Sequence, residues 1–192
     1  MATPMAQRIV AIHESLAAAG VGHALGGAVA LAFHTLRPRA TNDIDLNVFV
    51  SGSRSAEVLR SLPPQVRWSS RHIRIAEVTG EVKLRWLREG PVDLFFSKDD
   101  YYRLVDRRKE QKPFAGAIIP VLSATDLTVF KAVFGRDKDW VDIGEMLRAG
   151  TVDLEEAVRW AEHLGGAVVR QNLEDAIIPG YTQRYEDGNL GP

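Results

Sequence analysis

Residues 25–50 read LGGAVALAFHTLRPRATNDIDLNVFV, and this stretch decides the fold. From residue 44 onward, apolar residues alternate with Asp45, Asn47 and Phe49, which predicts a half-buried β-strand. Side chains two apart on a strand lie on one face, so Asp43 and Asp45 are expected to share a face, about 7 Å apart. Such a carboxylate pair suits one or two hard divalent cations such as Mg²⁺, which keep several waters and bind substrate phosphates.

A glycine pair precedes this strand. Gly26 and Gly27 follow a short apolar run that ends at residue 25 and precede a helical run from residue 28 to about 36, which must end before Pro38. A glycine turn that opens a helix lets backbone amides approach an anion closely. The predicted unit is therefore strand, glycine turn, helix, loop and acidic strand. The alternative is a helix N-terminus that happens to precede an exposed acidic strand.

The loop before the acidic strand carries Arg39 and Thr41, which are predicted to contact phosphate. The planar guanidinium of arginine matches phosphate oxygens in a fork geometry. The alternative for Arg39 is a surface arginine paired with a nearby acid.

A third carboxylate lies in a predicted hairpin of residues 82–88 with 92–96, joined by a Glu-Gly-Pro turn. Asp93 is the one carboxylate in an otherwise apolar strand. Burial of a lone carboxylate is costly, so it needs a partner or a metal ion. Asp93 is therefore predicted to join Asp43 and Asp45. The alternative is a solvent-facing aspartate on an edge strand.

A lysine-bearing helix follows an N-cap signal at residues 123–126 and ends at Gly135. Lys131 is predicted to face substrate phosphates, although a snorkelling surface lysine would show the same pattern. The next helix reaches about residue 147 and carries Asp139 and Asp142 three residues apart, hence on one face.

The remaining elements are predicted from periodicity and turn residues. They are a helix over 5–19, a strand over 22–25, a helix over 54–62, a strand over 66–79, a helix or crossing loop over 99–109, an edge strand or an approach to the next helix over 117–122, and helices over 153–163 and 167–177. The polar tail from residue 179 is expected to be loose.

The composition is that of a water-soluble globular chain, with 45% hydrophobic and 26% charged residues among 192. There is no cysteine, which excludes disulfides and thiolate metal sites. No signal peptide or membrane span is evident, so a cytoplasmic location without membrane attachment is expected. Residues 51–90 hold eight basic and four acidic residues (+4), whereas 137–192 hold five basic and twelve acidic ones (−7). The basic middle could face a polyanion, or these charges are simply solvated.

The motifs taken together, Gly26-Gly27, RATNDIDL at 39–46 and VDLF at 92–95, resemble those of the DNA polymerase β-like nucleotidyltransferase superfamily. The later segment ATDLTVFKAVFGRDKDWVDI at 124–143 is more specifically similar to the AbiEii/MenT-type bacterial nucleotidyltransferase toxins. The resemblance implies an α/β (α+β) fold with a small mixed sheet flanked by helices and a C-terminal helical region. It divides the chain into a catalytic core (1–122), a helical region completing the active-site cleft (123–180) and a flexible tail (181–192).

The resemblance also implies a function. Asp43, Asp45 and Asp93 would bind Mg²⁺ or Mn²⁺, and Asp93 would complete the second metal site or act as base. Together with Lys131 they form the expected catalytic set. Nucleotide phosphates would be bound by a wider set, namely Gly26, Gly27, Arg39, Thr41, Lys131 and Asp142. The enzyme would transfer NMP from a nucleoside triphosphate, CTP or ATP, to the 3′ end of tRNA, as the toxin paired with a cognate antitoxin protein.

Three other functions are compatible with the sequence. The same fold could modify a small hydroxyl compound such as an antibiotic, with the acidic C-terminal third forming a pocket for a cationic drug. It could be an antitoxin that adenylylates a partner toxin, although that branch is usually shorter. A non-catalytic nucleotide-binding scaffold is the last, and the retained set of three aspartates argues against it.

Overall fold

The computed structural model describes residues 4–35, 39–87 and 89–177. The chain forms two compact units. The first comprises Met1–Val29 and Ala40–Leu122, and the second comprises Ala30–Arg39 and Ser123–Pro192. The tail expected over 181–192 lies outside the described residues.

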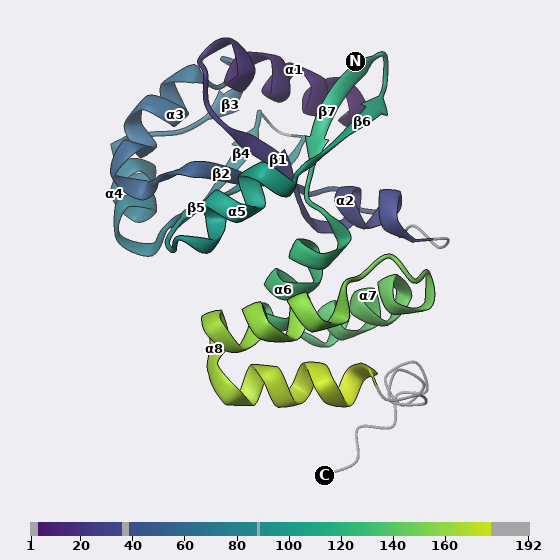
Figure 1. Cartoon of the computed structure of the whole chain (residues 1–192). Coiled ribbons are helices and arrows are strands. Elements are labelled where there is room, and N and C mark those ends of the chain that lie inside the picture. Colours follow the sequence, from purple (N-terminus) through teal and green to yellow (C-terminus); the bar gives the residue numbers. More distant parts are fainter. Residues whose placement is uncertain (1–3, 36–38, 88, 178–192) are drawn as a thin grey trace. The chain divides into compact units, whose positions relative to one another are not determined.

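The first unit is built on a mixed sheet (Figure 1). Its strands are β1 (His23–Leu25), β2 (Ile44–Ser51), β3 (Val66–Arg67), β4 (Glu81–Trp86), β5 (Gly90–Ser97), β6 (Glu110–Phe114) and β7 (Ala117–Val121). The described strands lie in the order β3-β4-β5-β2-β1-β7-β6. Strand β2 pairs with β5 in parallel and β1 with β7 in parallel, while the other neighbours are antiparallel. The hairpin predicted around residue 90 is confirmed as β4–β5.

Alternating burial divides the sheet into two faces. In β4 the pattern is strict, with Val82, Leu84 and Trp86 buried and the intervening residues exposed. Strands β2 and β5 bury their own alternate residues, among them Leu46 and Leu94. This apolar face supplies the core, because burial of such side chains provides most of the favourable free energy of folding. The polar residues between them lie on the opposite face.

The helices of the first unit pack around this sheet. They are α1 (Met5–Ala18), the start of α2 (Gly27–His34), a 3₁₀ turn η1 (Gly52–Arg54), α3 (Ser55–Ser61), α4 (Ser70–Thr79) and α5 (Tyr101–Arg108). Fully buried residues such as Ile12, Leu16 and Leu59 show which helix faces complete the core.

The strand predicted over 66–79 is wrong for most of its length. Only β3 is extended, and α4 follows it. The helix begins where the Ser69 N–H donates to Nδ1 of His72 (2.9 Å) and ends at Gly80, whose φ of +70° is left-handed. These local start and stop signals outweigh the weak alternation of the segment.

The edge strand predicted over 117–122 is also corrected, because β6 covers β7 and forms the edge itself. Proline is tolerated at position 120 because β7 is short of partners on its other side. On the β1 side, the described register pair of β7 is Val121 with Leu25, and Pro120 has no partner on β1 within the described ladder. A proline lacks the N–H that a fully paired interior strand would need.

The second unit is helical. Besides the continuation of α2 it holds α6 (Ala124–Phe134), α7 (Asp137–Arg148) and α8 (Leu154–Ile177), which contact one another. The predicted N-cap is confirmed, since Ser123 Oγ accepts the N–H of Asp126 (3.1 Å). The two helices expected over 153–163 and 167–177 are confirmed, because the segment labelled α8 is divided at Gly166, whose φ of 78° and ψ of −175° are non-helical. The predominance of helices flanking a mixed sheet confirms the α/β class.

None of the described helices combines the length and apolar character that crossing a membrane requires.

Candidate active site

The first unit brings two of the predicted aspartates side by side. Asp45 of β2 and Asp93 of β5 are direct register partners in a parallel strand pair. Register partners point to the same face, and Asp43 lies two residues before Asp45, next to the first residue of β2. Asp45 and Asp93 therefore lie on one face of the sheet, and Asp43 is near enough for its charge to contribute to the raised pKa of Asp93.

Thr41 fixes the chain where β2 begins. Its Oγ1 accepts the N–H of Asp43 at 3.1 Å and lies 3.4 Å from the carbonyl oxygen of the same residue. The contacts described for Thr41 thus go to the backbone of Asp43, which they hold at the start of the strand.

The two glycines are required by close approach of neighbouring side chains. Gly27 has a φ of +54°, and a Cβ there would lie 1.8 Å from Oδ2 of Asp45. At Gly26 a Cβ would lie 2.9 Å from Nδ2 of Asn47. The Gly26 N–H donates to the carbonyl of Asp45 (2.9 Å), so this amide extends the β1–β2 pairing. The turn thus places the helix start directly against the Asp45 carboxylate.

Asn47 is a residue of this face that the sequence reasoning did not single out. It follows Asp45 by two positions, is buried, and packs against Gly26. A polar residue at the same parity as the aspartates was the available signal.

Asp93 has one satisfied and one unsatisfied oxygen. Its Oδ2 lies 3.2 Å from Nζ of Lys83, the register partner of Asp93 on β4. Its Oδ1 is buried and has no hydrogen-bond partner among the described residues. Burial raises the pKa of Asp93, the hydrogen bond and charge of Lys83 oppose this, and the negative charge of Asp43 adds to the rise. The result is a carboxylate that is poorly compensated by the protein itself.

The carboxylates fit a hard divalent cation by their donor chemistry and by the orphaned Oδ1 of Asp93. Across the described ranges, however, no three acidic, histidine or cysteine side chains are gathered into a ready metal cluster. Oδ2 of Asp93, which such a cation would share, is occupied by the ion pair with Lys83.

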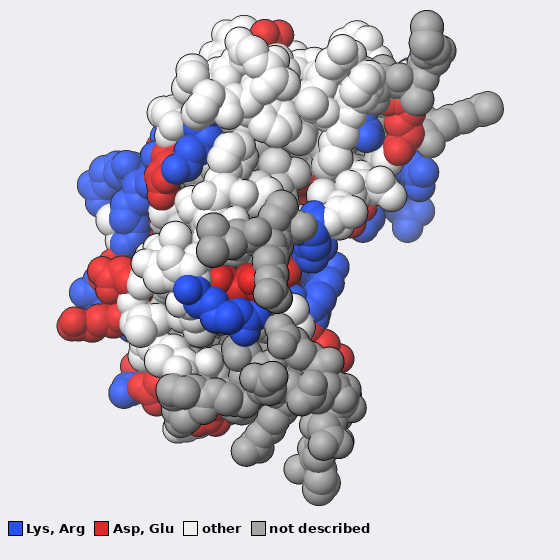
Figure 2. All heavy atoms as spheres, turned by 90° about the vertical axis from the view of Figure 1, so that its right-hand side faces the viewer, with Lys and Arg blue, Asp and Glu red and all other residues white. Residues whose placement is uncertain are grey.

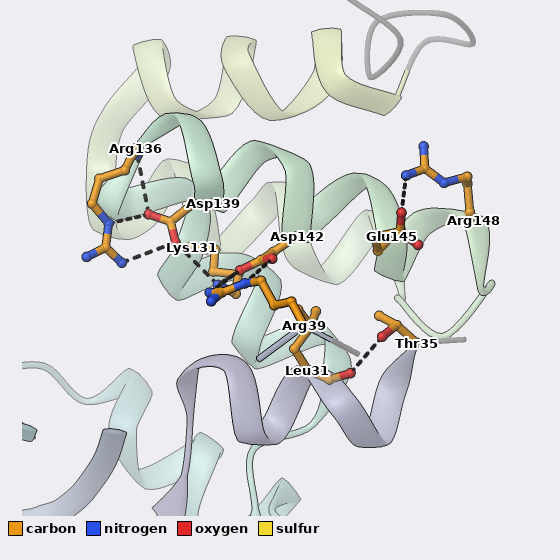
Figure 3. A network of polar contacts seen from close by, with 9 residues as sticks. All are labelled: Leu31, Thr35, Arg39, Lys131, Arg136, Asp139, Asp142, Glu145 and Arg148. Carbon is orange, nitrogen blue, oxygen red and sulfur yellow. Dashed lines mark hydrogen bonds and ion pairs between the residues drawn. The ribbon is translucent and has the colours of Figure 1, made fainter. Parts of the chain in front are cut away.

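The other predicted residues meet in the second unit, in the ion-pair network of Figure 3. Arg39 donates from Nε and Nη2 to the two oxygens of Asp142, each at 2.9 Å. Lys131 lies 2.6 Å from Oδ2 of Asp142 and 3.3 Å from Oδ1 of Asp139. Arg136 holds Asp139 in turn, from Nε (2.6 Å) and Nη2 (3.1 Å). Three cations and two carboxylates thus form one continuous chain.

Burial in this network is uneven. The side chains of Lys131, Asp139 and Asp142 are 5%, 0% and 3% exposed, whereas that of Arg39 is 38% exposed. Burial alone would raise the pKa of Asp142, but the hydrogen bond from Arg39 and the charge of Lys131 outweigh it and lower the pKa. Lys131 is therefore a buried ion-pair partner and not a snorkelling surface lysine.

Charges on the molecular surface are mixed. On the face shown in Figure 2, basic and acidic side chains lie next to one another in small groups. On this face, neither sign of charge forms a continuous patch.

No protein-family model and no curated protein matches the chain. Solved structures do. An antigenic nucleotidyltransferase-like protein from Paracoccidioides brasiliensis is similar with a TM-score of 0.54 and 16% identity, over 90% of this chain and 91% of that one. The antibiotic-resistance factor ANT(2'')-Ia is similar with a TM-score of 0.50 and 16% identity, over 100% of both chains. At these identities the likeness concerns architecture. The chain has the mixed-sheet fold of nucleotidyltransferase-like proteins.

Proposed function

We propose that this protein is a nucleotidyltransferase that transfers NMP from a nucleoside triphosphate to an acceptor hydroxyl. The observation that carries the proposal is the register pairing of Asp45 with Asp93, on the face shared with Asp43 and against the Gly27 turn. Like charges placed side by side in a sheet are unfavourable, so this arrangement needs a compensating ligand.

Asp43, Asp45 and Asp93 would hold the divalent ion, Mg²⁺ or Mn²⁺. When bound, such an ion neutralises phosphate charge and stabilises the attacking and leaving oxygens of an in-line displacement. Lys83 would release Oδ2 of Asp93 when the cationic ligand takes its place, since the lysine is exposed and its ion pair is weakly held.

The nucleotide phosphates would lie at the start of α2. The first amides of a helix have no intrahelical acceptors and favour anions. The Gly26 amide donates to Asp45 O, so its contribution to phosphate binding is to let the turn approach closely. Thr41 would act through the backbone of Asp43. CTP or ATP is the expected nucleotide.

Arg39 is a partly exposed cation at the end of the ion-pair network, and we assign it to a phosphate group of the nucleotide. Asp142 grips its guanidinium in a bidentate contact, and buried Lys131 fixes Asp142. Lys131 and Asp142 would thus be positioning residues for Arg39. Direct contact of Lys131 with phosphate would require the buried lysine to leave both carboxylates.

In the chemical step the acceptor oxygen attacks the α-phosphorus, a new P–O bond forms, and the bond to pyrophosphate breaks. The hydroxyl proton needs an acceptor. Where Asp93 does not complete the metal site, its Oδ1, which has no hydrogen-bond partner among the described residues, would take up this proton.

The acceptor that we propose is the 3′ end of a tRNA, with the protein acting as the toxin of a toxin–antitoxin pair. The basic residues between 51 and 90 support a polyanionic acceptor, since lysine and arginine contacts to phosphates dominate the affinity for nucleic acids. A cognate antitoxin protein would be the second partner.

The test is to incubate the protein with Mg²⁺, total bacterial tRNA and each labelled NTP in turn, beside Asp43→Ala. Label on tRNA with the wild type alone is the expected result. Label on an aminoglycoside or on a protein instead would keep the transferase and replace the acceptor. No label on any of these acceptors would refute the proposed activity.

A further inference from the structure

The polar face of the sheet continues from Asp93 to its edge as a row of basic side chains. Register pairs place Lys83 beside Asp93, Arg85 beside Pro91, and Arg67 beside Arg85. We call Arg67, Lys83 and Arg85 the basic row. All three are exposed, while their neighbours along β3 and β4 are buried on the other face.

Two members of the basic row are placed at a cost to stability. Arg67 and Arg85 face each other directly across the antiparallel β3–β4 pair. Like charges at directly opposed positions destabilise a sheet. In the part of the chain that the structure describes, no acidic side chain forms an ion pair with either of them. Glu81, the acidic residue of β4, lies beyond Lys83 at the opposite end of the strand.

The basic row is extended, so it suits a long ligand better than a single small group. Neighbouring strands lie about 4.8 Å apart, so the two steps from β5 to β3 span about 10 Å. Strand β3 is the edge of the described sheet on this side, so a chain lying along the row could leave the sheet there. Long basic side chains lining such a path suit a phosphodiester backbone, in which negative charges recur at short intervals.

We propose that the basic row binds the phosphodiester backbone of an RNA acceptor and leads its terminal hydroxyl to Asp93. This inference rests on the proposed nucleotidyl transfer and adds the residues that select a polynucleotide over a small hydroxyl compound. Lys83, the counter-ion of Asp93, is the member of the basic row that would contact the phosphate nearest the reacting hydroxyl.

The test is tRNA binding without nucleotide, measured by fluorescence anisotropy at 50 and 200 mM salt. The variant is Arg67→Gln with Arg85→Gln. Each single-strand phosphate contact contributes about 0.7 to the magnitude of the slope of log K against log salt. When salt rises from 50 to 200 mM, tRNA affinity falls by some factor, and loss of two contacts should make that factor about 7-fold smaller. The matched control is Arg60→Gln with Arg103→Gln, which removes two exposed charges from α3 and α5.

Folding is controlled by the melting temperature. Removal of two opposed like charges should leave the melting temperature of the variant unchanged or raise it. With that result, a loss of tRNA binding does not come from unfolding. The proposal is overturned if the wild type does not bind tRNA, if the variant keeps the wild-type salt dependence, or if the control loses as much. If the variant binds tRNA more weakly and the control does not, the result supports the basic row. Absence of NMP transfer would refute the proposed function and would leave this binding result standing.

Discussion

Lys131→Met tests whether the buried lysine of α6 supports the fold or touches substrate. Methionine fills nearly the same space but removes the charge that lies 2.6 Å from Asp142 and 3.3 Å from Asp139. Loss of one partner from a buried ion pair costs about 3–5 kcal/mol, because a charge is left uncompensated. Each carboxylate keeps a bidentate arginine, so the lower end, about 3 kcal/mol, is expected.

The assay is urea and thermal unfolding followed by circular dichroism. For a chain of this length, 3 kcal/mol corresponds to a fall in Tm of about 6–12 °C. Lys138→Met is the matched control, because this lysine is exposed on α7, and its effect should stay within about 0.5 kcal/mol. Adding Asp142→Asn to Lys131→Met should recover part of the loss, because the stranded charge is then removed as well.

The reasoning is refuted if Lys131→Met unfolds like the wild type while transfer to the acceptor collapses. That combination would mean that the lysine contributes nothing net to the network and acts on the substrate directly. A fall in stability with kcat preserved at low temperature would instead establish a purely structural role.

Three further predictions concern the first unit. Gly27→Ala forces a side chain at φ +54° into the Asp45 carboxylate, and displacement of that group should lower kcat about 100-fold; unchanged kcat would contradict the packing argument. In Asp93→Asn, transfer should be lost but Tm at pH 7 should rise, because the raised pKa of Asp93 means that the folded state disfavours its ionised form. On acidification, the Asp93 carboxyl is protonated in the folded wild type before it is in the unfolded chain, so the Tm difference between variant and wild type should shrink as the pH falls through the raised pKa. A lower Tm for the variant at pH 7 would contradict this. Burial lowers the pKa of His23 to about 4, so between about pH 6.5 and pH 4 this histidine is protonated only in the unfolded state. Stability should fall by about 3 kcal/mol across that window and much less in His23→Gln, measured by urea unfolding at each pH.

Local chemistry decided how much of the fold was predictable. Alternation in β2 and β4 and the N-cap at Ser123 act within a few residues, so they could be read from the sequence. Helix α4 was misread because its apolar residues are sparse, although Ser69 and Gly80 marked both of its ends. The place of β7 in the sheet depends on pairing with β6, which no local pattern encodes.

The sequence predicted that the aspartates share one face of the sheet, but not which residues are partners across neighbouring strands. Asp43 and Asp45 were assigned to one face because they lie two residues apart, and Asp93 was assigned to join them because a lone carboxylate in an apolar strand needs a partner or a metal ion. That Asp45 and Asp93 are register partners depends on how β2 and β5 align, and the hydrophobic pattern fixes only odd against even registers. The Arg39–Asp142 contact joins residues 103 apart in sequence, so the alternative of a surface arginine paired with an acid could not be tested without the fold.

The two charged groups differ in how far the protein itself satisfies them, and this difference separates fold from function. In the second unit, the carboxylates of Asp139 and Asp142 both receive charged donors, and their network can stabilise the fold without a ligand. In the first unit, Asp93 keeps a buried oxygen without a donor. Buried atoms of Arg8 and Trp86 also have no hydrogen-bond partner among the described residues, but Asp93 is the one of these three that is the register partner of another carboxylate, that of Asp45. The unsatisfied carboxylate is therefore where a ligand is expected, and the satisfied network is expected to hold its shape whether or not that ligand is bound.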